Sequence, residues 1–150
     1  MANTNLKFEI DVPDAILDKI NSEVDTFLKE AIVDITNDIL MTAQARAPKD
    51  KGDLEQTGSM DVNKSTLTGE VSFNAKRKGF NYARKMDQAT YNLGETSRRK
   101  PPVKSKFYHG SMPVGKGYLT DTFDKGSRAT KYGYKKYVSD GIGKIIDKYN

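Results

Sequence analysis

The chain has 150 residues, which suits one domain with a modest core, and its 36% hydrophobic and 30% charged residues leave little apolar surface to spare. It has no cysteine, which excludes disulfides, thiolate metal sites and a cysteine nucleophile. Residues 1–50 hold five bases and ten acids, whereas residues 51–150 hold 20 bases and ten acids, so the net charge of +5 is unevenly spread.

The first half of the chain is dominated by one predicted helix. Residues 6–12 alternate apolar and polar side chains, which predicts a short strand. From Pro13 to Arg46, apolar residues recur every three or four positions, which predicts an amphipathic helix of about 33 residues and about 50 Å. A globule of this size does not cover such a length, so either the helix breaks or part of its apolar stripe packs on another chain. Pro48 ends it, because proline disfavours helical geometry at the preceding residue.

The second half reads as short elements separated by turns. Residues 53–63 and 67–74 predict a pair of strands joined by the turn-rich 63–66. A basic turn at 76–79 and a short helix at 82–87 follow. Residues 88–117 predict an irregular loop with turns at 107–110 and 113–115, and its basic, proline-broken part at 97–106 is expected to be mobile. Helices are predicted to begin at 117–123 and to run over 131–149.

These elements predict an α+β fold: one domain over residues 1–150, with a long N-terminal helix and a C-terminal helix packed on a small antiparallel sheet. We expect no membrane association, because no apolar run approaches the roughly 20 residues that span a bilayer. The start of the chain lacks the basic and apolar regions of a secretory signal.

The residues that carry chemistry do not assemble into an enzyme signature. His109 is the only histidine, and neither a nucleophile-elbow motif nor a phosphate-binding P-loop is present. The acid pairs Asp50 and Asp53, and Asp121 and Asp124, are best read as turn and cap residues. We therefore expect no enzyme, no cofactor and no metal.

The uneven charge admits three interpretations: a solvated surface, a basic face for nucleic acid, or an acidic face that meets the basic face of the next subunit in a ring. The basic loop at 98–106 precedes Phe107 and Tyr108, and bases beside aromatics are typical of single-strand binding. A small basic nucleic-acid-binding protein is thus the alternative to the function given below.

The end of the long helix carries a motif. In Ala47-Pro48-Lys49-Asp50-Lys51-Gly52-Asp53-Leu54, Pro48 stops the helix, Asp50 is placed to accept backbone N–H groups, and Gly52 permits a positive φ. Leu54 then returns the chain to the core as a strand. This helix-to-strand corner resembles the signature of tailed-bacteriophage neck proteins, also called tail-completion, head–tail joining or minor capsid proteins. The sequence departs from that signature at Lys51, where threonine is usual, and at Glu55, where a base is usual.

Two further segments are similar to the same family. Tyr82-Ala83-Arg84-Lys85-Met86-Asp87 resembles its tyrosine-alanine segment, although the glycine that normally follows comes only at Gly94. His109 and the stretch from Pro113 through Gly117, Tyr118 and Leu119 resemble minor capsid versions from phages of Gram-positive bacteria. The resemblance spans residues 12–148.

The resemblance implies a virion structural protein, with copies that form a ring at the head–tail junction around the DNA passage. The implied partners are the chain itself, the head connector or adaptor, the tail terminator or tail tube, and DNA contacted without sequence preference. The implied location is the neck of the virion, after assembly in the host cytoplasm. The candidates for inter-subunit or DNA contact are the helix acids Glu23, Asp25, Glu30, Asp34 and Asp38 and the bases Lys76, Arg77, Lys78, Arg98, Arg99 and Lys100.

Overall fold

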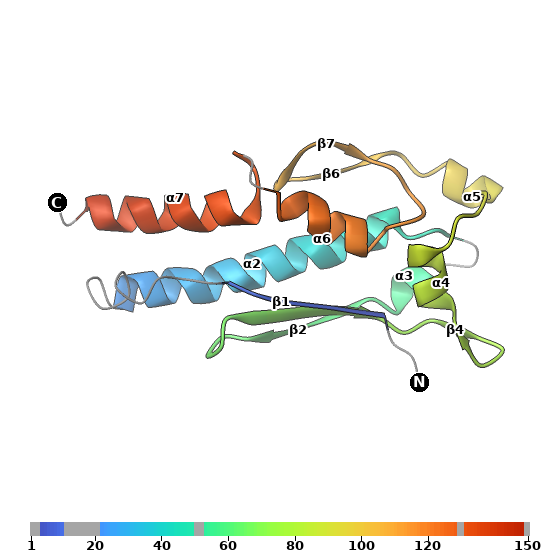
Figure 1. Ribbon diagram of the computed structural model, residues 1–150, viewed down its shortest axis with the longest axis horizontal. Coiled ribbons are helices and arrows are strands. Elements are labelled where there is room, and N and C mark those ends of the chain that lie inside the picture. Colours follow the sequence, from blue (N-terminus) through green and yellow to red (C-terminus); the bar gives the residue numbers. More distant parts are fainter. Residues whose placement is uncertain (1–3, 11–21, 50–52, 129–130, 149–150) are drawn as a thin grey trace.

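The computed structural model describes residues 4–10, 22–49, 53–128 and 131–148, with Asp53 described in its backbone only. The molecule is elongated, and helix α2 (Ser22–Arg46) runs through its middle (Figure 1). A three-stranded sheet covers one side of α2, and helices α6 (Thr120–Gly126) and α7 (Tyr134–Asp147) with a β-hairpin cover the other. The predicted α+β class, with its long N-terminal helix and its C-terminal helix, is confirmed.

The sheet is antiparallel, with the order β1-β3-β2 for β1 (Thr4–Glu9), β2 (Ser59–Asn63) and β3 (Thr68–Phe73). Leu6 and Met60 both face Val71 in the register. Val71 and Phe73 are fully buried against α2. Strand β1 begins two residues before its predicted start, and the end of the predicted strand lies outside the described residues.

The predicted strand over 53–63 is wrong in its first part. Residues Asp53–Gln56 form a helical turn, α3, and the strand begins only at Ser59. The Thr57 hydroxyl donates to the Leu54 carbonyl at 2.8 Å, which closes the turn. Leu54 shares the even-numbered spacing of Met60 and Val62, so the strand pattern concealed a segment whose Leu, Glu and Gln are good helix formers.

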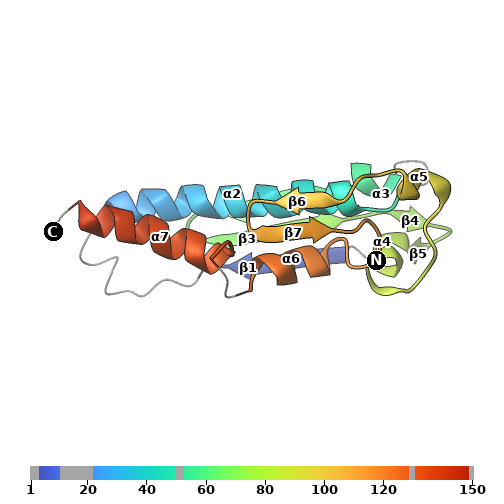
Figure 2. The same ribbon diagram turned by 90° about the horizontal axis from the view of Figure 1, so that it is seen from above.

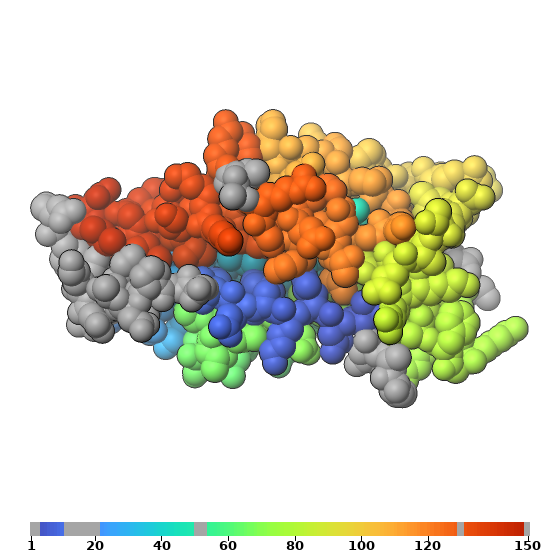
Figure 3. Space-filling view, in the orientation of Figure 1, coloured from blue at the N-terminus to red at the C-terminus, as the bar shows by residue number. Residues whose placement is uncertain are grey.

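Helix α2 ends at Arg46, as Pro48 predicts, while the predicted turns before Ser22 lie outside the described residues. Its buried residues occur on two faces, because the sheet packs on one side and α6 and α7 on the other. The space-filling view shows little of α2 between β1 and the C-terminal helices (Figure 3). Among the described large apolar side chains, only Met41 and Phe80 are exposed, at 60% and 44%. The described part of this helix therefore does not leave a stretch of its apolar stripe uncovered for another chain, as its predicted length had suggested.

The segment after the sheet follows the prediction closely. Strands β4 (Lys76–Arg77) and β5 (Phe80–Asn81) form a short hairpin around the predicted basic turn, where Lys78 and Gly79 have φ values of 50° and 83°. Helix α4 (Tyr82–Gln88) confirms the predicted short helix. Asn81 caps it, because its side-chain oxygen accepts the Arg84 N–H at 3.0 Å.

The prediction of an irregular loop over 88–117 is wrong. This segment contains helix α5 (Glu95–Arg98) and a hairpin of β6 (Val103–Ser105) and β7 (Tyr108–Met112). Only Phe107 and Met112 of the hairpin are fully buried, so the strands lack the apolar alternation that reveals a strand in sequence. The turn predicted at 107–110 is limited to the hairpin tip, while 113–115 is turn-like as predicted.

Helix α6 begins within the predicted start at 117–123 and continues to Gly126, while helix α7 is shorter than the predicted 131–149. Helix α7 lies along α2, and at its first turn the Tyr134 ring stacks on Phe8 of β1 with centroids 6.2 Å apart. Gly141 lies against the Phe27 ring of α2, where a Cβ would come within 2.0 Å of Phe27 Cζ. This glycine therefore lets the two long helices approach closely, which offsets its low helix propensity. No helix in the described ranges combines the length and apolar character needed to cross a membrane.

Candidate functional site

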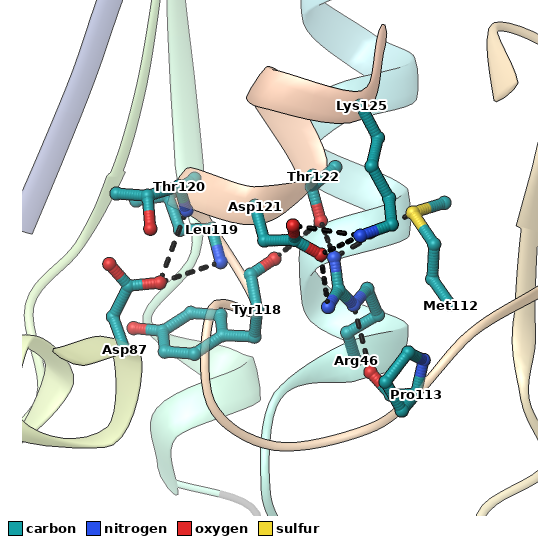
Figure 4. A network of polar contacts seen from close by, with 10 residues as sticks. All are labelled: Arg46, Asp87, Met112, Pro113, Tyr118, Leu119, Thr120, Asp121, Thr122 and Lys125. Atoms are coloured by element: carbon teal, nitrogen blue, oxygen red, sulfur yellow. Dashed lines mark hydrogen bonds and ion pairs between the residues drawn. The ribbon is translucent and has the colours of Figure 1, made fainter. Parts of the chain in front are cut away.

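The three segments singled out in the sequence meet at one place, the C-terminal end of α2 (Figure 4). The corner brings Arg46 and Ala47, α4 brings Ala83 and Asp87, and the third segment runs from Pro113 into α6. Direct hydrogen bonds join them: Gly115 N–H donates to the Arg46 carbonyl at 2.9 Å, and Gly117 N–H donates to the Asp87 carbonyl at 2.8 Å. We call this group of residues the junction network.

Arg46 lies at the centre of the junction network with 1% of its surface exposed. Its Nε donates to the Pro113 carbonyl, one Nη donates to Thr122 Oγ1, and the other pairs with Asp121 Oδ2, each at 2.9 Å. Its guanidinium thus ties the last turn of α2 to α6 and to the loop before it. A buried charge requires such a set of partners.

Asp121 is shared between two cations, because Lys125 Nζ also donates to it at 2.7 Å. Burial would raise the pKa of Asp121, but the hydrogen bonds from Lys125 and Arg46 outweigh burial and hold this pKa below its ordinary value. The carboxylate is therefore ionised at neutral pH and balances the buried guanidinium.

Asp87 joins α4 to α6 from a position that is 2% exposed. Its Oδ1 accepts the N–H groups of Leu119 and Thr120 at 3.0 and 3.1 Å, which caps the first turn of α6. The Tyr118 hydroxyl donates to the Ala83 carbonyl at 3.0 Å. Burial, and next the charge of Asp87, raise the pKa of Tyr118 well above its ordinary value, so its hydroxyl remains a donor.

Gly117 is required where the loop enters α6. Its φ is +80°, and a Cβ there would come within 2.7 Å of Asp121 Cβ. Tyr118 and Leu119, which follow it, are fully buried in the core. The glycine-tyrosine-leucine segment is therefore a packing and turning element.

The corner itself is held by the segment that was expected to be a mobile basic loop. The Ser97 hydroxyl accepts the Lys49 N–H at 2.8 Å and donates to the Lys49 carbonyl at 3.1 Å. Lys100 Nζ donates to the Ala47 carbonyl at 2.7 Å, which satisfies one of the free carbonyls at the end of α2. Burial lowers the pKa of Lys100 from its ordinary value.

The other members of the three segments are mainly structural. Ala47, Pro48 and Ala83 are buried, and Leu54 is 2% exposed within α3 rather than within a strand. Tyr82 and Met86 are half-buried on α4. Asp50 and Gly52, to which a turn and a positive φ were assigned, lie outside the described residues.

Three of the five candidate acids on α2 bind residues from the C-terminal half of the same chain, although contacts with another copy were predicted for them. Glu23 pairs with Lys148 at 2.7 Å, Asp34 accepts the Tyr137 hydroxyl at 3.0 Å, and Asp38 accepts the Ser105 hydroxyl at 2.6 Å. Burial raises the pKa of Asp38. Asp25 is exposed beside Lys29 and Glu30 is exposed.

The candidate bases fall into two groups at the end of the molecule where α2 ends (Figures 1 and 2). Lys76 and Lys78 are exposed on the β4–β5 hairpin, where the Arg77 guanidinium lies 4.1 Å from the Tyr82 ring centroid. Arg98 and Arg99 are exposed on and after α5, and Arg99 pairs with Glu95. Lys100 differs from the others because its ammonium group binds the corner.

The polar groups of the junction network hold three segments of the chain together. Arg46 and Asp121 are paired, and the hydroxyls of Tyr118 and Thr122 donate to backbone carbonyls. Asp87 accepts two backbone N–H groups through Oδ1, while its Oδ2 is buried without a hydrogen-bond partner. His109 lies elsewhere, exposed and stacked on Tyr132 with centroids 4.7 Å apart. Within the described ranges, no cluster of three histidine, cysteine, aspartate or glutamate residues could hold a metal ion.

Comparison with known proteins adds no relative: the chain matches no family model, no curated protein and no solved structure.

The sequence reasoning missed Arg46, which is the centre of the network. One signal was present: Arg46 follows Ile39 and Ala43 at the spacing of the apolar stripe, so a lone charge occupied a core-facing position. Asp121 was noted only as one of a pair with Asp124 and read as a cap residue. Its actual partner is 75 positions away, and nothing local in the sequence indicates it.

Proposed function

We propose that this protein is a structural subunit of the neck of a tailed bacteriophage. Copies form a ring at the head–tail junction, which binds the head connector on one face and the tail on the other and surrounds the DNA passage. The observation that carries the proposal is the convergence of the three family-like segments at the junction network, although they are far apart in the sequence.

That convergence supports a mechanical role. The three segments supply the end of α2, helix α4 and the entry to α6, and apart from the buried Asp87 Oδ2 the polar groups of the network described above bind one another. A subunit under load between a head and a tail needs such a cross-linked centre. The residues of the family-like segments therefore have a structural role in holding the fold together.

Two exposed surfaces suit a head-to-tail contact between copies. The outer face of α2 presents Glu30, Asp34, Asn37 and Met41, which follow at helical spacing and are all exposed. The tip of the β4–β5 hairpin presents Lys76, Lys78 and Phe80. Each surface has one exposed apolar side chain beside charges of one sign, and the two signs are opposite.

We therefore assign the outer face of α2 in one copy to the hairpin tip of the next. The apolar pair supplies the buried centre, and the charges set register and association rate more than affinity. Such a contact is heterologous, since it uses two different surfaces, and it generates a ring if the rotation closes. Glu23, Asp34 and Asp38 all have partners within the chain, and of these only Asp34 lies on the exposed outer face assigned to the contact.

Three single substitutions test this assignment: Met41→Glu, Phe80→Glu and, as a matched control in an exposed turn, Thr66→Glu. Native mass spectrometry and negative-stain microscopy would follow assembly of the purified chain, alone and with the products of the genes that flank its own. We expect rings for the wild type and the control, and monomers with an unchanged melting temperature for the other two.

Mixing the two defective variants adds a sharper readout. Each retains the surface that the other lacks, so a heterologous contact gives dimers that do not grow. A self-complementary contact gives no such rescue. Normal rings from Met41→Glu or Phe80→Glu, or a wild type that remains monomeric with every flanking product, would refute the proposal.

A further inference from the structure

A groove lies where the tip of the β6–β7 hairpin meets the start of α7 beside α2, and it includes Lys106 and Phe107 from the basic-aromatic stretch noted in the sequence. Figures 1 and 2 both show the hairpin tip next to the first turn of α7. The groove has a volume of about 440 Å³. Its walls are the aromatic residues Phe27, Phe107, Tyr132 and Tyr137 and the lysines Lys106, Lys131 and Lys144, with parts of α7. We call it the basic-aromatic groove.

The three lysines give the basic-aromatic groove a positive charge, which the nearby Asp38 partly offsets at Lys106. None of them forms an ion pair within the described ranges, and Asp140, the acid in the lining, pairs with Lys136 at 2.6 Å. Lys106 Nζ lies 5.5 Å from the Tyr137 ring centroid, and Lys131 Nζ lies 5.2 Å from that of Tyr132. Cations held beside rings in this way remain available to an anion.

The rings provide the second half of the recognition surface. Tyr132, Tyr137 and Phe27 are half-buried, so each presents an edge or part of a face to the groove. His109 stacks on Tyr132 at 4.7 Å and extends the aromatic surface outward. Phe107 is 1% exposed and packs edge-on against Tyr137 at 5.2 Å, so it supports the wall and does not itself stack with a ligand.

We propose that the basic-aromatic groove binds single-stranded nucleic acid, with phosphates on the lysines and one or two bases against the tyrosines. Flat apolar rings beside lysine ammonium groups match a chain that alternates aromatic bases with phosphates. An acidic peptide would bind the lysines but would not stack on the aromatic rings. A duplex would keep its bases stacked inside, away from them.

This site is distinct from the bases at the other end of the molecule. Arg98 is the last residue of α5 and Arg99 follows it, and Figure 2 shows α5 far from the start of α7. The inference does not depend on ring formation, because all its residues belong to one copy. A failure of assembly would leave it intact, and a failure of strand binding would leave the neck proposal intact.

Fluorescence anisotropy with a labelled thymidine strand of about 12 nucleotides tests the proposal. The triple variant Lys106→Ala, Lys131→Ala and Lys144→Ala should bind at least about tenfold more weakly at low salt, and the slope of log affinity against log salt should fall by about 2. The control removes the same charge elsewhere: Lys7→Ala, Lys64→Ala and Lys85→Ala, for which we expect less than about a twofold change.

A second variant separates base stacking from simple charge attraction. Tyr132→Ala, checked for an unchanged melting temperature, should weaken strand binding by about fivefold or more, while polyglutamate binding stays the same. A duplex with the same number of phosphates should bind more weakly than the strand. The proposal is overturned if the strand does not bind, if the control triple variant loses as much, if Tyr132→Ala has no effect, or if the duplex or polyglutamate binds as tightly as the strand.

Discussion

Replacing Arg46 by methionine is the most informative test of the junction network. Methionine keeps the apolar stem of the side chain but removes its three hydrogen bonds to oxygen and its contact with Met112 Sδ. Arg46 is 1% exposed, but Pro113 is exposed and the Asp121 side chain is 33% exposed, so water replaces part of what these two partners lose. The Pro113 carbonyl loses the Nε donor, and Asp121 loses one of its two cations.

The size of the effect follows from which partners are left unsatisfied. Breaking a buried ion pair by removing one partner costs about 3–5 kcal/mol. Asp121 keeps Lys125 and its side chain is 33% exposed, so the lower end applies, and we expect a loss of about 3 kcal/mol. For a chain of this size, that lowers the melting temperature by about 10 °C.

Urea unfolding followed by circular dichroism measures this loss, provided that the m-value stays constant. Arg99→Met is the matched control, because Arg99 also pairs with an acid but its side chain is 76% exposed. We expect this control to change the free energy of unfolding by less than about 0.5 kcal/mol. A loss below about 1 kcal/mol for Arg46→Met would refute the central role of the buried guanidinium.

Three further predictions concern stability. Gly117→Val should lower the free energy of unfolding by about 1–3 kcal/mol, because the φ of Gly117 is +80°. Gly143→Ala should raise it by about 0.5–1 kcal/mol, because a Cβ there meets open space within a helix. Equal effects of the two substitutions in thermal melts would contradict this. Lys100→Met should cost about 1–2 kcal/mol through the lost cap on Ala47, and an unchanged urea midpoint would exclude that cap. The raised pKa of Asp38 means that its contribution is fully present below about pH 4 and is lost as the pH rises through the folded-state pKa. Asp38→Asn should therefore flatten the fall in stability above about pH 4, and an unaltered pH profile would count against it.

The long-period features of the fold were readable from sequence. The apolar repeat of α2 and the stop at Pro48 predicted a helix that indeed ends at Arg46. Alternation predicted β1 and β3, and the short helix α4 was also found. These elements bury regular stripes, so their periodicity is visible without any knowledge of the partner surface.

Short elements held by long-range polar contacts were not readable. The β6–β7 hairpin and α5 bury few apolar side chains, and α5 is anchored by Ser97 on Lys49, 48 positions away. The sequence suggested that the three segments belong together through a resemblance, but it did not show that they touch. Arg46, which joins two of them, could be recognised only as a charge out of place on an apolar stripe.

The most direct test of the neck proposal is to locate the protein in particles. Virions that carry a short peptide tag on this chain, labelled with antibody-coated gold and viewed by electron microscopy, would show its position. The proposal predicts gold at the junction between head and tail, and heads without attached tails when the gene is disrupted. Gold spread over the capsid or along the tail, or tailed infectious particles that lack the protein, would contradict it.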